Sequence, residues 1–100
     1  MAICLITNNP HETAEQYDRV MSHLYASGPV PPEGAQLLIA GHGREGWRAV
    51  SVWDDPQALQ RFFADRLTPA YHAANVSPEA TTQESFEIHT LIAPELASHM

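Results

Sequence analysis

Residues 46–56 read GWRAVSVWDDP, an apolar strand-like run that ends at Asp54-Asp55-Pro56, where a helix can begin. Residues 2–10, AICLITNNP, repeat this order and end at Asn9-Pro10. A helix-like segment and a further apolar run follow each of the two stretches. Two βαβ halves in a chain of 100 residues predict a single four-stranded sheet with both helices on one face.

The two helix starts are predicted from capping residues. Asn9-Pro10 is expected to cap and begin the first helix, with Glu12 as the acid of a capping box. Asp55-Pro56 is expected to begin the second helix in the same way. Pro69 falls inside the second helical pattern and is expected to kink the helix or restart it there. The apolar positions with helical spacing are Tyr17, Val20, Met21 and Leu24 in the first helix, and Leu59, Phe62, Phe63, Leu67, Ala70 and Ala74 in the second.

Four short apolar runs are the predicted strands. They cover residues 2–7, 36–40, 47–53 and 86–92, and the glycines of residues 41–46 suit a hairpin loop between the second and third. A polar loop is expected at 75–85, and the whole chain is predicted to form one domain over 1–94 with a tail at 95–100.

Composition narrows the class of partner. The net charge is −7, with five arginines and no lysine. An acidic chain without a basic cluster argues against nucleic acid and against anionic membranes as partners. No stretch approaches the roughly 20 apolar residues of a membrane span, and no signal peptide is recognisable, so we expect a cytoplasmic protein. The single cysteine, Cys4, lies in an apolar run and is expected to be buried.

The first three predicted strands carry apolar residues on both faces, as Leu37, Leu38, Ile39 and Ala40 illustrate. The helices can cover only one face of the sheet. A large apolar patch left open is not stable in a soluble monomer. We therefore expect a second copy of the chain to cover the other face, which predicts a homodimer.

This arrangement resembles the dimeric α/β barrel superfamily of ferredoxin-like proteins. The resemblance extends over about residues 2–92 and is most specific at residues 46–56. A hairpin glycine, a strand ending in Trp-acid and a capped helix with an early Phe-Phe, here Phe62-Phe63, are typical of the superfamily. It implies an α+β ferredoxin-like βαββαβ fold: a four-stranded antiparallel sheet with two helices on one face, assembled into a homodimeric α/β barrel. The superfamily includes antibiotic-biosynthesis monooxygenases that use no cofactor, polyketide cyclases and heme-degrading monooxygenases.

The leading hypothesis for function is a cofactor-independent monooxygenase or cyclase that acts on an aromatic or polyketide-like small molecule in secondary metabolism. Deprotonation of a phenol or enol would precede oxygenation or ring closure, and the pocket would orient the substrate. The alternatives are a non-catalytic ligand-binding or stress-response barrel, and a heme-binding or heme-degrading monooxygenase. The residues expected to line the pocket are Asn8, Trp53, Phe62 and Arg66.

Three further residues are candidates for acid–base chemistry. Tyr71-His72 resembles the tyrosine and histidine that some polyketide cyclases of the superfamily use, and His89 or His72 would be the base. Adjacent helical residues point about 100° apart, so only Tyr71 is expected on the pocket side. A structural role for His89 remains an alternative, as does core packing for Trp53 and either a surface or a cavity position for Arg66.

The heme alternative would place Asn8, Phe62 and His72 where heme-degrading members have an asparagine, a tryptophan and a heme-ligating histidine. Phe62 departs from that pattern, and His72 would face inward only if the helix restarts at Pro69. The six histidines form no metal-binding motif, so no metal site is predicted and no cofactor is expected.

Overall fold

The computed structural model describes residues 1–77 and 81–92. Their elements, in chain order, are β1 (Ile3–Asn9), α1 (Ala14–Ser27), β2 (Ala35–Gly43), β3 (Gly46–Trp53), α2 (Pro56–Phe62), the π-helical turn η1 (Phe63–Leu67), α3 (Thr68–Ala73) and β4 (Thr82–Glu87). The strands form one antiparallel sheet in the order β2-β3-β1-β4. This is the predicted βαββαβ fold. The predicted tail at 95–100 lies outside the described residues.

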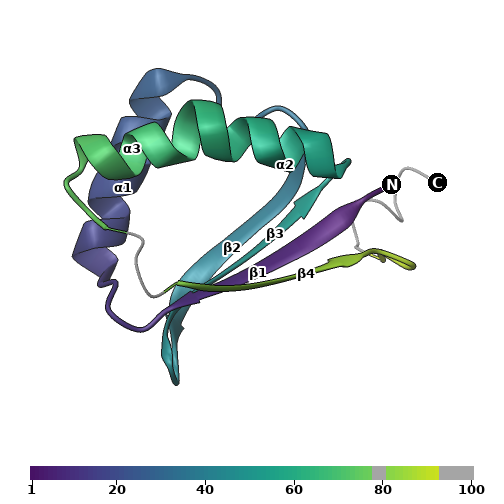
Figure 1. The fold of residues 1–100 in the computed structure, drawn as a ribbon, viewed down its shortest axis with the longest axis horizontal. Helices are drawn as coiled ribbons and strands as arrows, with labels where there is room; N and C mark the ends of the chain where they lie inside the picture. The colour runs from purple at the N-terminus through teal and green to yellow at the C-terminus, as the bar shows by residue number, and fades with distance from the viewer. Residues whose placement is uncertain (78–80, 93–100) are drawn as a thin grey trace.

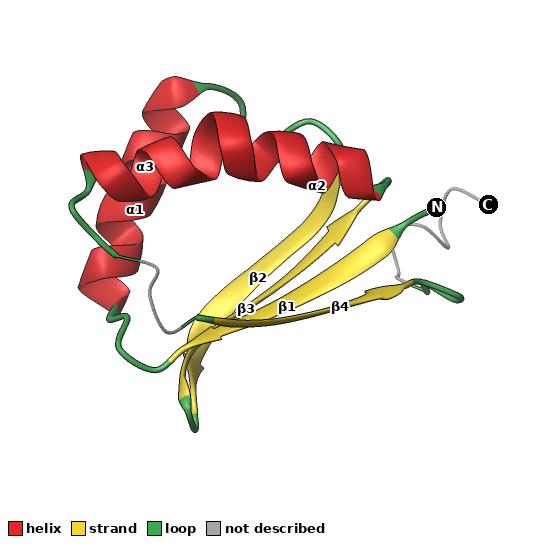
Figure 2. Ribbon diagram, in the orientation of Figure 1, coloured by secondary structure: helices red, strands yellow, loops and turns green. Residues whose placement is uncertain are grey.

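All helical segments lie on one face of the sheet (Figure 1). The α2-η1-α3 run crosses above the strands, and α1 packs beside its far end (Figure 2). The predicted apolar stripes face inward: Val20 and Leu24 of α1, and Leu59 and Phe62 of α2, are buried. Trp53, at the end of β3, is 1% exposed and stands at the centre of this core.

Strand register decides which side chains face the helices. Leu5 of β1 lies opposite Ser51 of β3 and belongs to the core under the helices. The neighbouring Cys4 lies opposite Val52, and both point to the other face because side chains alternate along a strand. The sheet therefore has one helix-covered face and one face that no described helix covers (Figure 1).

The first helix begins later than its sequence predicted. Thr13, not Asn9, is the N-cap, and it forms a reciprocal capping box with Gln16. The Asn9 side chain instead accepts a hydrogen bond from the His11 backbone N–H, which shapes the turn before the helix. Glu12 is consequently not a capping residue, and its carboxyl group is buried next to α3.

The second helix begins as predicted. The Asp55 side chain caps it through the Ala58 N–H, and Pro56 takes a first-turn position. The predicted disturbance at Pro69 is also confirmed, because one π-helical turn precedes it. Proline donates no backbone hydrogen bond and its ring crowds the carbonyl four residues earlier, so a wider turn lets the helix continue.

The last strand was predicted too far along the chain. β4 covers Thr82–Glu87, not 86–92, and its polar side chains are all exposed. Thr82 lies opposite Asn8 and Glu87 opposite Ile3, so the strand follows the free edge of β1. Backbone pairing with that edge, which apolar alternation does not reveal, sets the position of β4.

Candidate functional site

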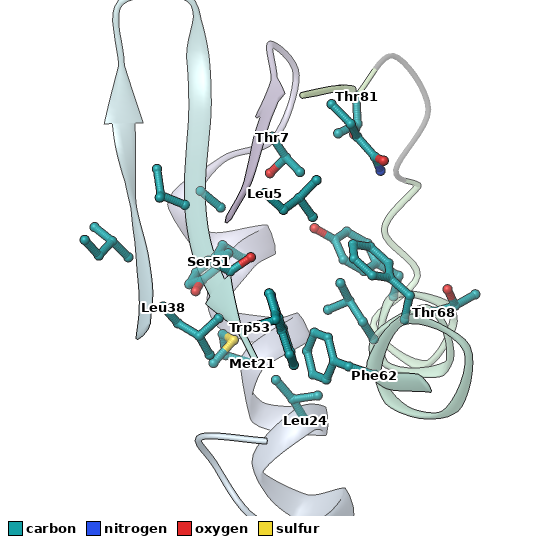
Figure 3. A pocket seen from close by; sticks show the side chains of 18 residues that line it. Leu5, Thr7, Met21, Leu24, Leu38, Ser51, Trp53, Phe62, Thr68 and Thr81 are labelled. Atoms are coloured by element: carbon teal, nitrogen blue, oxygen red, sulfur yellow. The ribbon is translucent and has the colours of Figure 1, made fainter. Parts of the chain in front are cut away.

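A cavity of about 390 Å³ lies between the sheet and the helices. Volumes of this order are typical of small-molecule sites. Figure 3 shows Trp53 and Phe62 on one side of it, near Leu24, with Thr7 and Thr81 at the opposite end. Most of the lining is apolar, and its polar members are Thr7, Tyr17, Ser51, Thr68, Tyr71, Thr81 and Gln83.

No charged side chain lines this cavity within the described part of the chain. Among the described residues, the lining groups that titrate are the phenols of Tyr17 and Tyr71. Burial raises the pKa of both, and the nearby Glu12 carboxylate raises them further, so both stay neutral at physiological pH. The cavity therefore suits a largely apolar, uncharged molecule that carries a few hydrogen-bonding groups.

Aromatic rings form the inner wall. The rings of Trp53 and Phe62 lie 4.9 Å apart at an angle of 36°, an arrangement that stabilises the wall beyond simple area burial. The indole Nε1–H of Trp53 is buried and has no acceptor among the residues that the structure describes.

Tyr71 joins the cavity to a buried carboxyl group. Its hydroxyl donates a hydrogen bond of 2.9 Å to Oε1 of Glu12, which is only 5% exposed. Glu12 lies in the turn after β1, and Thr7 of the same strand also lines the cavity. Burial raises the pKa of Glu12, although hydrogen bonds with Tyr71 and Asn9 oppose the shift.

Three predicted site residues meet at the cavity: Trp53, Phe62 and Tyr71. Asn8 does not, because Thr7 faces the helices and the next residue on a strand faces the other way. The Asn8 amide instead donates to the Glu45 carbonyl oxygen in the β2–β3 turn. The predicted position of Asn8 in the pocket is therefore corrected by strand alternation.

Arg66 lies outside the lining as well. Its guanidinium donates to the carbonyl oxygens of Leu24 and Pro29 and to Ser27 Oγ at the C-terminal end of α1. Carbonyls at a helix C-terminus have no partner within the helix, and a cation complements the dipole there. In this structure Arg66 joins η1 to the end of α1.

Neither candidate histidine reaches the cavity. His72 is exposed and borders a second hollow of about 260 Å³, which shares Thr68 and Tyr71 with the cavity, even though the helix is interrupted before Pro69. His89 is exposed and lies beyond the end of β4. The groups that the heme alternative needs, Asn8, Phe62 and His72, are thus not gathered around one cavity.

The sequence interpretation missed Glu12 and Tyr17 as neighbours of the site. Asn9 and Glu12 predict a capping box with Glu12 as its acid, yet Thr13-Ala14-Glu15-Gln16 already carries the spacing of a capping box one turn later. Tyr17 was expected only to pack. It does pack on Trp47, with ring centroids 4.9 Å apart, and it also lines the cavity.

The structure describes no group of three or more His, Cys, Asp or Glu side chains placed to hold a metal ion, and residues 78–80 and 93–100 lie outside that statement. Among the helices of the described residues, none has the length and apolar character needed to cross a bilayer.

No protein-family model matches the chain, and no curated protein matches it in sequence. Solved structures do match. SnoaB, a cofactor-independent oxygenase from Streptomyces nogalater, superposes with a TM-score of 0.61 at 17% identity, over 91% of this chain and 95% of that one. A candidate antibiotic biosynthesis monooxygenase from Chloroflexus aurantiacus gives 0.64 at 14% identity, over 93% and 98%. A dimeric ferredoxin-like protein of unknown function from Jannaschia gives 0.61 at 13% identity, over 88% and 100%.

The fold is ferredoxin-like. The structures that share it include antibiotic-biosynthesis monooxygenase-like proteins and proteins described as dimeric. At these identities the similarity establishes the fold and leaves the chemistry to be argued from this chain's own residues.

Replacing Arg66 tests its placement. Arg66→Met removes the donors to the α1 carbonyls and is expected to lower the free energy of unfolding by about 1–3 kcal/mol, measured by urea denaturation. Arg61→Met, at an exposed position of α2, is the control and should stay within about 0.5 kcal/mol. Binding of a small molecule in the cavity should be unchanged in folded Arg66→Met, and weakened binding with normal stability would contradict the assignment.

The buried Glu12 carboxyl predicts a pH-dependent stability difference. Its pKa is higher in the folded than in the unfolded chain, so the stabilisation that comes with protonation is complete below the unfolded pKa and is lost as pH rises through the folded pKa. The stability of the wild type relative to Glu12→Gln should therefore increase as pH falls from 7 towards 4. Urea titrations at several pH values measure this, with Glu15→Gln as the exposed control, and an opposite slope would show that the pKa is lowered.

Proposed function

We propose that this protein is a homodimeric, cofactor-independent enzyme that oxygenates or cyclises an aromatic, polyketide-like phenol or enol. The observation that carries the proposal is the cavity itself: an uncharged pocket with Trp53 and Phe62 on one wall and hydroxyl groups at the other end. Such a lining favours a planar ring system and orients its oxygen atoms towards the polar end. SnoaB, which has the same fold, supports oxygenation as the reaction.

The reaction can proceed without a resident cofactor because the substrate supplies the electrons. An electron-rich phenolate can reduce dioxygen directly. For 1,8,9-trihydroxyanthracene, the enol form of 1,8-dihydroxyanthrone, one O₂ gives 1,8-dihydroxyanthraquinone and one H₂O. The ring carbon gains one oxygen atom, and the second leaves with two substrate hydrogens. The protein has to bind the substrate, orient it and accept its proton.

The uncovered face of the sheet supports the homodimer. Leu37, Val52, Cys4 and Phe86 lie side by side across the four strands on this face. The inner two are buried between Leu37 and Phe86, which are 44% and 50% exposed. A continuous apolar row of this kind favours a second sheet as its cover, and structural neighbours are described as dimeric.

The dimer is tested by its mass. Native mass spectrometry should give twice the 11.1 kDa of one chain. Phe86→Asp places a charge in the proposed interface and is expected to raise the dissociation constant about 100-fold, close to 3 kcal/mol. Tyr25→Asp, on the exposed surface of α1, is the control and should leave the dimer intact. A monomeric wild type, or a fully dimeric Phe86→Asp, would exclude this face as the interface.

Catalysis is tested with 1,8,9-trihydroxyanthracene under air, with the protein treated with a chelator beforehand. The wild type is expected to form the anthraquinone faster than buffer does, with one ¹⁸O atom incorporated from ¹⁸O₂. Trp53→Phe shrinks the aromatic wall and should lower kcat/KM about tenfold, because small misplacements of substrate are costly. Tyr25→Phe, which is remote and exposed, should not.

The same assay separates the alternatives. Tight binding of the probe with no turnover would favour a non-catalytic ligand-binding barrel. Neither binding nor turnover would remove aromatic phenols as the ligand class.

A further inference from the structure

Glu12 is a buried acid that does not cap a helix. Thr13 and Gln16 cap α1, so the Glu12 carboxyl plays no part in starting that helix. Placing an ionised carboxylate in a site that is 5% exposed is unfavourable unless it is paired. Among the described residues, the groups that act on its pKa are the neutral Tyr71 hydroxyl and Asn9 side chain, and neither is a cation.

Tyr71 is the link between this carboxyl and the cavity. Its hydroxyl hydrogen points to Glu12 Oε1, because a carboxylate only accepts hydrogen bonds. A phenol oxygen that donates one hydrogen bond still has lone pairs that can accept another. No donor to that oxygen occurs among residues 1–77 and 81–92. A ligand hydroxyl in the cavity can therefore hydrogen-bond to Tyr71.

The titratable groups around Glu12 come from two helices. Tyr71 approaches from α3, and Tyr17, whose pKa the Glu12 charge raises, lies on α1. Both phenols are held in the neutral form. Within residues 1–77 and 81–92 the lining carries no other acid or base, and the two candidate histidines are outside it. Glu12 is the carboxylate that the structure connects to the cavity through a single hydrogen bond.

We propose that Tyr71 and Glu12 are the proton-accepting pair of the cavity, specific for a phenol or enol whose hydroxyl reaches Tyr71. The ligand O–H transfers its proton to the Tyr71 oxygen as the Tyr71 proton moves to Glu12 Oε1. The products are a ligand anion, a neutral tyrosine and a neutral carboxylic acid, so charge and protons balance. Tyr71 would touch the substrate, and Glu12 would act through it. This inference rests on the proposed function and names the group that accepts the substrate's proton.

A general base with a pKa raised towards the working pH is well matched to this task, because it is ionised when needed and still binds a proton well. Burial makes the ionised Glu12 carboxylate unfavourable in the resting protein and so favours its protonated form. The charge then resides on the ligand, where it is needed for reaction with dioxygen.

The test follows oxidation of 1,8,9-trihydroxyanthracene between pH 4 and 9 in the folded dimer. Wild-type kcat/KM should fall on the acid side as Glu12 is protonated. Glu12→Gln keeps a hydrogen-bond acceptor for Tyr71 but loses the base, so its rate should fall about 100-fold or more and the acid limb should disappear. Its anaerobic dissociation constant for the probe should change less than about threefold. Glu12→Asp should restore part of the rate, and Tyr71→Phe should resemble Glu12→Gln.

Two controls separate catalysis from structure. Glu15→Gln and Tyr25→Phe, both at exposed positions of α1, should keep the wild-type rate and pH profile. In the wild type, the Glu12 carboxyl is titrated by ¹³C NMR. Its pKa should lie above the ordinary value of 4.5 and match the acid limb of the rate. This measurement keeps the proposal testable if a Glu12 variant does not fold.

The possible outcomes distinguish failure of the proton-accepting pair from failure of the proposed function. A Glu12→Gln protein that turns over the probe at the wild-type rate, or an acid limb unrelated to the Glu12 titration, overturns the proton-accepting pair and leaves the oxygenase proposal standing. A wild type that binds the probe without oxidising it overturns both. If Glu12→Gln weakens probe binding and lowers the rate equally, with the acid limb preserved, the Glu12–Tyr71 hydrogen bond only stabilises the fold. That outcome also overturns the proton-accepting pair.

Discussion

Side-chain alternation along β1 and β3 is the constraint on which the rest of this structure depends. It directs Leu5 and Trp53 towards the helices, and Cys4 and Val52 to the opposite face. The residues on the side of Leu5 and Trp53 form the core and a wall of the cavity. The residues on the side of Cys4 and Val52 form an apolar face that the helices cannot cover. A shift of one residue in the register would exchange the two sets, so the site and the proposed dimer interface are fixed together.

The interrupted helix determines which of its residues meet the cavity. The run from Pro56 continues through a π-helical turn, past Pro69, to Ala73 instead of ending at the proline. Its last segment directs Tyr71 to the cavity and leaves the adjacent His72 exposed. Arg66, from the widened turn, binds the end of α1. The proline thus affects both how the two helices are joined and which acid–base candidate faces the cavity.

Charge is distributed unevenly around the cavity. The lining is neutral, while a carboxyl group is buried directly behind Tyr71. A neutral wall admits an apolar aromatic molecule without the desolvation cost of a charged one. A proton acceptor placed behind the wall can act on that molecule through one hydroxyl group. In the proposed mechanism Tyr71 belongs to both the lining and the acid–base pair, and it is 59 residues from Glu12 in the sequence.

The sequence by itself determined the order of elements, the start of α2 at Asp55, the interruption at Pro69 and the apolar positions of both helices. These features depend on local backbone geometry and on periodicity, which neighbouring residues specify. Of the residues expected at the pocket, Trp53, Phe62 and Tyr71 line the cavity, whereas Asn8 and Arg66 do not. Only the tertiary structure placed β4, since that strand depends on the free edge of β1. Only the tertiary structure paired Glu12 with Tyr71, 59 residues apart, and bound Arg66 to α1. Hydrogen bonds between distant segments form where packing brings the segments together. The residues next to each partner in the sequence do not specify which distant segment will lie against it.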